Sequence, residues 1–546
     1  MPTISRRTAL GLGAAAVSAP LLGSCSGGGS DSQTQDKIDD PDPNINPTGM
    51  PIVDEPITLT MMTGHKPATA DDWDSVASVR RMEELSNVHV EWGPVPSAGI
   101  AEKRNLALAS GDYPEVLNRT SLTSVDLTTY GEQGTFIPLN GLIDDYMPNL
   151  KAVMDEYPDI ASGMTMPDGN IYSMPTIYDP EFDALIMQRK LWVRQDWLDD
   201  FGMAEPTTLE EFEAYLTEVK GRNPVPAGAP DAIPFTASSN GSPMYEMFWG
   251  TFGIATRGRT AHPLDADPSG TLRFVPTSDG WREELEFMSR LYAQGLVQTD
   301  VFTNDAQTLN GNGRQGIIGA CVHYTPIAAF GEDIGSRYVA LPPLKKSSAD
   351  PVPSWNSVMA SLVSLGQFVI TDHATHPIEA ARWMDHYFGD DGARLFFLGI
   401  EGESYERTAD GSYEFTDMIA DNPDGLTANE ALKPYVTYMG GTYAGIVMEA
   451  YFKGAENSPQ SREGTAKVSG HRIDEVWPAF TYTSEEAAEL SSLTVDVEKL
   501  TDESRDGFVN GKRSLSEWDD YVGQFDSMGI ARYLEIQQAA HDRYQG

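Results

Sequence analysis

The sequence predicts an α/β fold with two lobes, and two observations lead to this class. Strand-like and helical segments alternate in the order β-α-β-α-β from Ile57 onwards, which places helices against a mainly parallel sheet. The 546 residues include about 490 that follow Pro56, and a chain of this length exceeds what one hydrophobic core can hold. The apolar content of 40% and the aromatic content of 10% are those of a globular protein.

The opening alternation contains three strands and two helices. Ile57–Met62 and Val88–Trp92 are predicted strands, and Val116–Leu117 begins a third. Apolar residues at helical spacing predict helices over Val76–Leu85 and Ile100–Ser110. Together these elements form the beginning of a lobe with an edge that faces a ligand.

Longer helices and buried strands follow in the rest of the chain. The run Thr207–Glu211 contains a Ser/Thr-x-x-Glu cap, which begins a helix with an apolar face. The run from Leu341 to Asn356 is typical of a segment that crosses between lobes. We expect strands at Gly316–Tyr324 and Phe368–Ile370, and helices at Trp281–Gly295, Pro377–Phe388 and Ile530–Tyr544.

The first 25 residues have the pattern of an export signal. Arg6 and Arg7 precede an uncharged run, Thr8–Leu22, which is shorter than the roughly 20 residues needed to cross a bilayer. The arginine pair resembles a twin-arginine signal, and the choice between this export route and the general secretory route stays open. Leu22–Cys25 resembles a bacterial lipobox, so we expect Cys25 to be acylated. The alternative is an ordinary signal with a chance cysteine near its cleavage site.

A polar run follows the signal and has no apolar periodicity, so its composition predicts a flexible tether and not a core. A tether of this length holds a domain roughly 30 Å from its anchor. The predicted organisation is therefore a signal peptide at 1–25, a tether at 26–56, a first lobe from 57–175 and 356–400, and a second lobe from 176–355 and 401–546.

The charge balance restricts the partners. The formal charge is −43, and loss of Arg6 and Arg7 with the signal leaves 81 acidic against 36 basic residues, or −45. Such a surface repels phosphate backbones, so nucleic acid is not expected as a partner. Acidic substrates are disfavoured in general, although a local basic pocket would override the global field. Only Cys321 remains after acylation of Cys25, which leaves no pair for an intramolecular disulfide.

The sequence gives no positive indication of catalysis, a metal or a cofactor. Neither His-Glu-x-x-His nor Gly-x-Ser-x-Gly occurs, and the acidic residues are too many to single out a catalytic pair. The nine histidines are scattered, and the nearest group is His373, His376 and His386. We therefore expect no cofactor, no metal and no enzyme activity.

Aromatic residues give the strongest functional signal. The chain has 10 Trp, 22 Tyr and 20 Phe, many of them beside polar residues at strand ends and in loops. Sugar rings stack on Trp and Tyr through their apolar faces, while polar side chains bind the hydroxyls. For each single aromatic, packing in the core is the competing interpretation. The candidate ligand-binding residues are His65, Trp73, Arg119, Tyr178, Trp249, Tyr324, Trp355 and Tyr405.

Several short motifs occur in a characteristic order along the chain: Leu108–Val116, Met166–Tyr172, Arg194–Leu198, Pro206–Phe212, Gly399–Tyr405 and Ala540–Tyr544. Together they resemble the bacterial extracellular solute-binding proteins of carbohydrate ABC importers. The resemblance implies a periplasmic-binding-protein-like fold of two α/β lobes that close on a sugar in the cleft between them. It also implies that the aromatic after the strand ending at His323, Tyr324, stacks on the sugar.

One departure from the family pattern concerns calcium. Many relatives have an Asp/Asn-rich loop that resembles a calcium loop before the Ile-Pro pair found here at Ile233 and Pro234. This chain has Asn223–Asp231 in that place, a stretch with few oxygen donors. The sequence therefore does not predict calcium binding there.

These observations lead to a predicted sugar-binding component of an ABC importer, a monomer that is lipid-anchored through Cys25 to the outer face of the cytoplasmic membrane and delivers its ligand to the permease. The alternative from another class is a lipid-anchored glycoside hydrolase or lyase at the cell surface. A noncatalytic binder of extended polysaccharide is a third hypothesis. Within the binding hypothesis, a peptide or lipid-derived ligand stays open.

Overall fold

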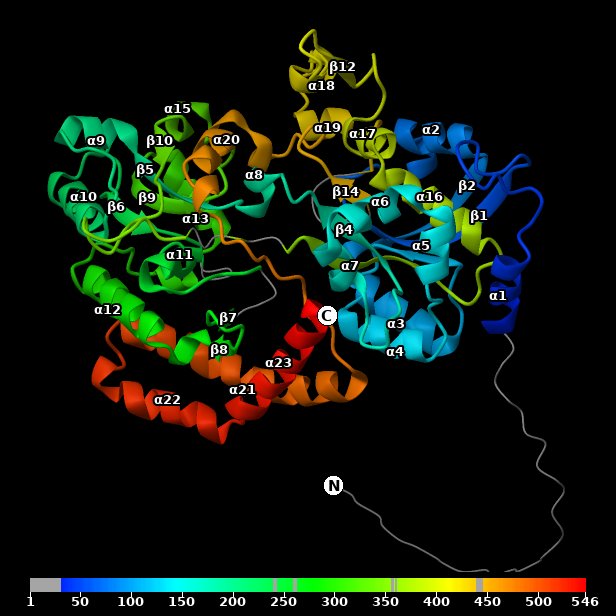
Figure 1. Ribbon diagram of the computed structural model, residues 1–546. Coiled ribbons are helices and arrows are strands. Elements are labelled where there is room, and N and C mark those ends of the chain that lie inside the picture. The colour runs from blue at the N-terminus through cyan, green and yellow to red at the C-terminus, as the bar shows by residue number, and fades with distance from the viewer. Residues whose placement is uncertain (1–30, 239–242, 259–262, 355–357, 359–360, 438–444) are drawn as a thin grey trace, which may run out of the picture.

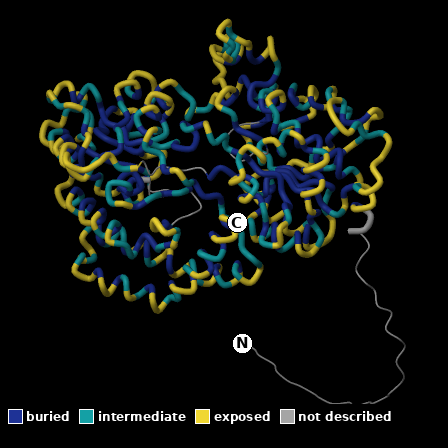
Figure 2. Tube along the Cα trace, viewed as in Figure 1, coloured by how far each residue is buried: buried dark blue, intermediate teal, exposed yellow. Residues whose placement is uncertain are grey.

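The structure is a computed structural model that describes residues 31–546 except 239–242, 259–262, 355–357, 359–360 and 438–444. Two lobes lie side by side, each built on its own β-sheet, and several segments connect them (Figure 1). The buried residues concentrate on the two sheets and on the helix faces against them (Figure 2). The predicted α/β, two-lobe fold class is confirmed.

The first lobe contains a six-stranded sheet in the order β14-β4-β11-β3-β1-β2. The predicted opening alternation is present, because β1 pairs in parallel with both β2 and β3. β11 returns antiparallel to β3 and β4. The strands are β1 at Ile57–His65, β2 at Val88–Pro96, β3 at Val116–Asn118, β4 at Met174–Tyr178, β11 at Val363–Ile370 and β14 at Gly445–Val447.

Helices with one apolar face cover this sheet. In α2 the buried positions Ser78, Met82 and Ser86 recur every fourth residue, as expected of a helix with one face on a sheet. α16 is buried along its whole length between the sheet and neighbouring helices. The main helices of the lobe are α2 at Ala77–Ser86, α3 at Ile100–Ser110, α4 at Ser124–Glu132, α5 at Asn140–Tyr146, α6 at Pro148–Glu156, α7 at Pro158–Met164, α16 at Pro377–Asp385 and α17 at Asp390–Leu398.

The second lobe has a four-stranded sheet in the order β10-β5-β9-β6. The predicted cap is confirmed: Thr208 and Glu211 form a capping box that starts α10, and Phe212 and Leu216 of its apolar face are buried. The strands are β5 at Lys190–Arg194, β6 at Ile233–Thr236, β9 at Ile318–His323 and β10 at Tyr338–Ala340. The main helices are α9 at Gln195–Phe201, α10 at Leu209–Arg222, α12 at Asp279–Ala293, α13 at Ala306–Arg314, α20 at Pro459–Ala466, α21 at Ser484–Val509, α22 at Trp518–Ser527 and α23 at Ile530–Gln545.

The chain crosses between the sheets more than once. It leaves the first sheet after β4 and enters the second at β5, and it returns from β10 to β11. It then crosses again from β14 to α20, which contacts β10. Because β14 pairs in parallel with β4, residues 445–447 belong to the first sheet, whereas the predicted boundaries assign them to the second lobe.

Part of the polar N-terminal run is folded onto the first lobe, which differs from the predicted tether over 26–56. Ile52 and Val53 are completely buried, and Ile45 forms a β-bridge with Val53. Arg382 of α16 donates hydrogen bonds to the carbonyls of Asn46 and Gly49. Two apolar residues and one buried arginine are enough to hold a segment that has no periodic pattern.

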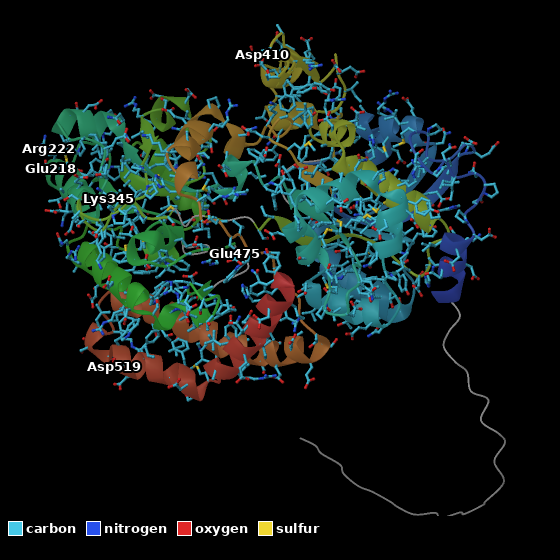
Figure 3. All side chains as sticks on the ribbon, viewed as in Figure 1. Glu218, Arg222, Lys345, Asp410, Glu475 and Asp519 are labelled. Carbon is cyan, nitrogen blue, oxygen red and sulfur yellow. The ribbon has the colours of Figure 1, made fainter. Side chains whose placement is uncertain are left out.

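A small unit projects beyond the two sheets (Figure 1). The strands β12 at Tyr405–Arg407 and β13 at Tyr413–Phe415 form a hairpin, followed by α18 at Asp417–Ala420 and α19 at Ala428–Leu432. This unit has its own apolar cluster around Ile419 and Val436. Asp410, in the hairpin turn, lies at its outer end (Figure 3).

Over the described residues, we find no helix with both the length and the apolar composition needed to span a membrane.

Candidate functional site

The strand ends that lie at the junction of the lobes define the candidate site. β1 is parallel to β3, and β3 and β4 are both antiparallel to β11, so the carboxyl ends of β1, β3 and β4 meet at one edge. The chain leaves this edge after Tyr178 and enters the second sheet at Lys190. Lys190 pairs with His323, so the end of β9 lies at the edge where the chain enters. Open α/β sheets bind ligands beyond the carboxyl ends of their strands.

At the first edge, three of the predicted residues come together. The Arg119 guanidinium lies 4.9 Å from the centre of the Trp73 ring, a cation–π arrangement. His65 lies on another side of Trp73, with the two ring centres 6.3 Å apart. Trp73 is itself buried and packs edge-on against Trp92 at 4.9 Å. A ligand at this edge therefore meets Arg119 before it meets the face of Trp73.

The backbone holds Arg119 in an unusual conformation. Its φ is +54°, in the left-handed region that residues other than glycine rarely adopt, and Ser121 has φ +59°. Gly64 of β1 is required beside it, because a Cβ there would lie 2.5 Å from the Arg119 carbonyl oxygen. The buried Arg104 donates hydrogen bonds to the carbonyls of Thr120 and Ser121, which fixes the turn. The local structure thus aims Arg119 at the cost of backbone strain.

A cavity of about 30 Å³ lies beside Arg119. It has room for a small polar group and not for a sugar ring, because one water molecule needs about 10–15 Å³. Trp92 and Trp383 are neighbours in its wall, with ring centres 6.1 Å apart. Its lining residues are Ser78, Val79, Trp92, Asn118, Arg119, Trp383, Met384, Tyr387, Phe396 and Thr437.

Two cationic side chains at this edge, Arg119 and Lys66, have lowered pKa values. Burial lowers the pKa of Arg119 to about 10. The pKa of Lys66 is also lowered, first by burial and then by the charge of Arg119. Burial raises the pKa of Tyr387, and the Arg119 charge opposes that shift. Arg119 and Lys66 thus carry their charges close to one another at this edge.

At the second edge, Tyr324 is the predicted residue, and Arg189 is its partner. Arg189 Nη2 donates to Tyr324 Oη at 3.1 Å, and the guanidinium carbon lies 5.0 Å from the centre of the ring. The pKa of His323 is lowered to about 4, mainly by burial and further by the charge of Arg189. Tyr324 is half-buried, so part of its surface stays open at the edge.

Lys190 is buried directly behind this edge. Its Nζ donates to Ser461 Oγ of α20 at 3.0 Å, and burial lowers its pKa to about 7. Gln460, the neighbour of Ser461, accepts from Thr325 at 2.7 Å and donates to the Gly335 carbonyl at 2.8 Å. α20 is thereby fixed to the ends of β5, β9 and the short helix α15 at Glu332–Gly335.

Of the other sequence candidates, one lies at the first edge, two are buried in the fold, and one lies outside the described residues. Tyr178 is half-buried at the end of β4. Trp249 is buried in the second lobe, edge-on to Trp281 at 5.8 Å. Tyr405 is buried in the projecting unit beside Tyr413. Trp355 and the acylation candidate Cys25 lie outside the described residues.

Sequence reasoning missed Trp92, Trp383, Tyr387 and Arg189 as candidates for the site. Trp383 and Tyr387 occur at helical spacing, which predicts only a buried helix face, and Trp92 lies within a strand. Arg189 had one usable signal, since it is a basic residue that directly precedes a buried strand in a strongly acidic chain.

In the loop Asn223–Asp231, side-chain oxygens accept hydrogen bonds from neighbouring groups of the chain. Asn223 donates to Asp231 Oδ1 at 2.9 Å, and its side-chain oxygen accepts from the amide of Ala232 at 2.6 Å. In the described portion of the chain, no cluster of three or more His, Cys, Asp and Glu side chains is placed to hold a metal ion.

This two-lobed fold, with polar and aromatic residues at facing strand ends, is that of a binding protein, and comparison with known proteins identifies its family. The model of the bacterial extracellular solute-binding proteins matches residues 77–402, more than half of the chain. The chain belongs to this family.

Two curated relatives match over most of their length. FusA, the fructooligosaccharide ABC transporter substrate-binding protein of Streptococcus pneumoniae serotype 4, is 27% identical over 92% of this chain and 94% of its own. YtcQ, the polygalacturonan/rhamnogalacturonan-binding protein of Bacillus subtilis, is 22% identical over 85% of this chain and 87% of its own.

Solved structures agree on the fold. FusA in complex with kestose has a TM-score of 0.71 at 24% identity, covering 90% of this chain and 99% of that one. A human-milk-oligosaccharide (HMO) binding solute-binding protein from Bifidobacterium longum infantis has a TM-score of 0.77 at 20% identity, with the same coverage.

Proposed function

We propose that this chain is the substrate-binding component of a carbohydrate ABC importer and that it binds an oligosaccharide between its two lobes. The observation that carries the proposal is the presence, at strand ends of both sheets, of an arginine against an aromatic ring: Arg119 with Trp73, and Arg189 with Tyr324. Aromatic faces and fixed hydrogen-bond donors are what a sugar-binding cleft requires. The carbohydrate-binding relatives support the same reading.

Binding follows from contacts with both edges. A sugar that contacts both lobes favours the closed form, and it shifts the open–closed equilibrium by the difference in its affinity for the two forms. Tyr324 supplies a stacking surface, and Arg119 supplies donors from the other side. The permease then recognises the closed form, and the sugar is delivered without chemical change. Trp355, Tyr178 and Tyr405 remain candidate contacts by sequence, whereas the burial of Trp249 against Trp281 favours core packing for that residue.

The lipobox-like Leu22–Cys25 and the polar run after it support a lipid anchor on Cys25. A mature chain held in this way works as a monomer at the outer face of the cytoplasmic membrane. Because Thr34 and residues 44–56 both pack on the first lobe, a tether in this chain is shorter than the sequence predicts, which favours a position of that lobe nearer to the membrane.

The experiment is thermal unfolding of the purified chain with a panel of mono- and oligosaccharides, fructooligosaccharides and milk oligosaccharides included. A ligand at 100 times its Kd adds about 2.7 kcal/mol to the free energy of unfolding. The proposal predicts such a rise with at least one oligosaccharide, which is recovered intact. Release of shorter sugars during incubation would instead identify the glycoside hydrolase or lyase, and no response to any sugar would refute carbohydrate binding.

A further inference from the structure

Two hydrogen-bond donors that line the cavity beside Arg119 have no acceptor. The half-buried Arg119 guanidinium forms no ion pair and no side-chain hydrogen bond with any described residue, and it lies over the Trp73 ring. The indole Nε1 of Trp92 is buried and likewise lacks a partner within the described ranges. Buried donors are nearly always paired in native structures, so the buried and unpaired Trp92 Nε1, next to a guanidinium that has no carboxylate partner among the described residues, indicates a missing acceptor.

The cavity wall provides no negative charge of its own. The chain contains 81 acidic residues, yet the described residues of the lining include no Asp or Glu. Two arginines elsewhere in the molecule show the alternative, a carboxylate partner: Arg194 pairs with Asp196 at 2.5 Å, and Arg257 with Asp265 at 3.0 Å. Arg119 is instead close enough to Lys66 for the two charges to repel. The site is therefore locally basic on a strongly acidic protein.

The missing acceptor has to be small and anionic. The cavity of about 30 Å³ accommodates a group the size of two water molecules, which corresponds to the two oxygens of a carboxylate. A guanidinium binds a carboxylate through two parallel N–H···O bonds, and a carboxylate has acceptor capacity left for an indole N–H. A sugar hydroxyl fits this cavity less well than a carboxylate, because it has no charge and is itself a hydrogen-bond donor.

We propose that this cavity is a subsite for a carboxylate substituent of the ligand, so that the preferred oligosaccharide contains a uronic acid residue. Arg119 binds the carboxylate, Trp92 Nε1 donates to one of its oxygens, and the sugar ring lies outside the cavity towards the second lobe. This inference rests on the proposed sugar-binding function and adds the chemical class of the sugar. The fixed backbone of residues 119–121 keeps the guanidinium in place before the ligand arrives.

The test uses calorimetric titration of the purified chain with trigalacturonic acid, its fully methyl-esterified form and galactotriose. The two neutral probes keep the shape of the sugar and lack the charge. We expect trigalacturonic acid to bind about 10- to 100-fold more tightly than either neutral probe, the range for charge-assisted hydrogen bonds. The difference should shrink as salt is raised, because the charge is screened.

Arg119→Gln should remove that preference, and Arg119→Lys should retain part of it through the charge alone. Arg407→Gln is the matched control, since Arg407 is an exposed arginine that stacks on a tyrosine of the projecting unit. Tighter binding of a neutral oligosaccharide, or an acid preference that survives Arg119→Gln, would overturn the inference and leave the proposed function standing. Binding of none of the probes or other sugars would refute both. Tighter binding of glucose 6-phosphate than of the uronide would overturn the assignment to a carboxylate.

Discussion

The two sheet edges that face the junction of the lobes use the same pair of groups in opposite ways. In the first lobe the aromatic Trp73 is buried and the arginine covers it, so that Arg119 is presented to a ligand. In the second lobe Arg189 Nη1 is buried without a partner among the described residues, and the half-buried Tyr324 is presented. The first edge presents the Arg119 charge, which lies over the Trp73 ring. The second edge presents the Tyr324 ring, which Arg189 holds in place. The first edge is thus suited to polar recognition and the second to stacking.

The largest expected effect is at Tyr324. Tyr324→Ala removes the stacking surface and should weaken binding of the preferred oligosaccharide by about 30-fold or more, corresponding to about 2 kcal/mol for a central aromatic anchor. Titration calorimetry measures this directly. Tyr324→Phe is the matched variant, because it keeps the ring and loses the hydrogen bond to Arg189. An unchanged Kd for Tyr324→Ala would remove the second edge from the site.

Arg189 should have a smaller effect, through the orientation of the ring. Arg189→Gln breaks the 3.1 Å hydrogen bond to Tyr324 Oη and the cation–π contact, so we expect about 10-fold weaker binding. If Arg189 acts only through Tyr324, the double variant with Tyr324→Phe should be little weaker than Arg189→Gln alone. Additive losses would show instead that Arg189 contacts the ligand itself.

The buried Lys190, behind the second edge, makes the free energy of unfolding depend on pH. Its folded pKa of about 7 lies below the unfolded value of 10.5, so between these values the unfolded chain binds a proton that the folded chain does not. Its contribution to the free energy of unfolding therefore rises as the pH is raised from 7 towards 10.5. Lys190→Met should abolish this component and stabilise the protein by about 1–4 kcal/mol at pH 7 and below.

Denaturant unfolding of both proteins across this pH range is the measurement. A difference between wild type and Lys190→Met that does not change with pH would contradict a buried, neutralised lysine.

The smallest effect on binding is expected at Trp249. This residue is buried against Trp281 in the second lobe, away from both edges. Trp249→Phe should lower the free energy of unfolding by about 1–3 kcal/mol and leave the Kd for sugar unchanged. A weakened Kd without loss of stability would return Trp249 to the site.

Local patterns predicted most of the regular structure because each element depends on its own periodicity and caps. Thr208 and Glu211 indicate where α10 begins, and Ile100–Ser110 has the same bounds in the sequence prediction and in the structure. β14 has only three residues and is a strand because β4 offers it a partner. Ile52 and Val53 are likewise ordered by contacts with distant residues that no local pattern reveals.

The sequence predicts candidate site residues where they lie at the ends of recognisable strands. His65, Arg119 and Tyr324 were predicted as candidates because each lies at or after the end of a recognisable strand in an α/β lobe. Trp92 and Trp383 lie almost 300 residues apart in the sequence. Both line the cavity beside Arg119 because the fold brings their ring centres to 6.1 Å from each other. Trp249 is of a residue type that can stack on a sugar, and in the fold it is buried as a core residue is. Its burial, which the sequence does not reveal, distinguishes core packing from ligand contact.

The most direct test of the account is whether one ligand uses both edges. The oligosaccharide selected by thermal unfolding would be titrated into the wild type, Arg119→Gln and Tyr324→Ala, with Arg407→Gln as the control. The account predicts that both edge variants weaken the same single-site Kd and that the control does not. A Kd that either edge variant leaves unchanged would contradict binding between the lobes.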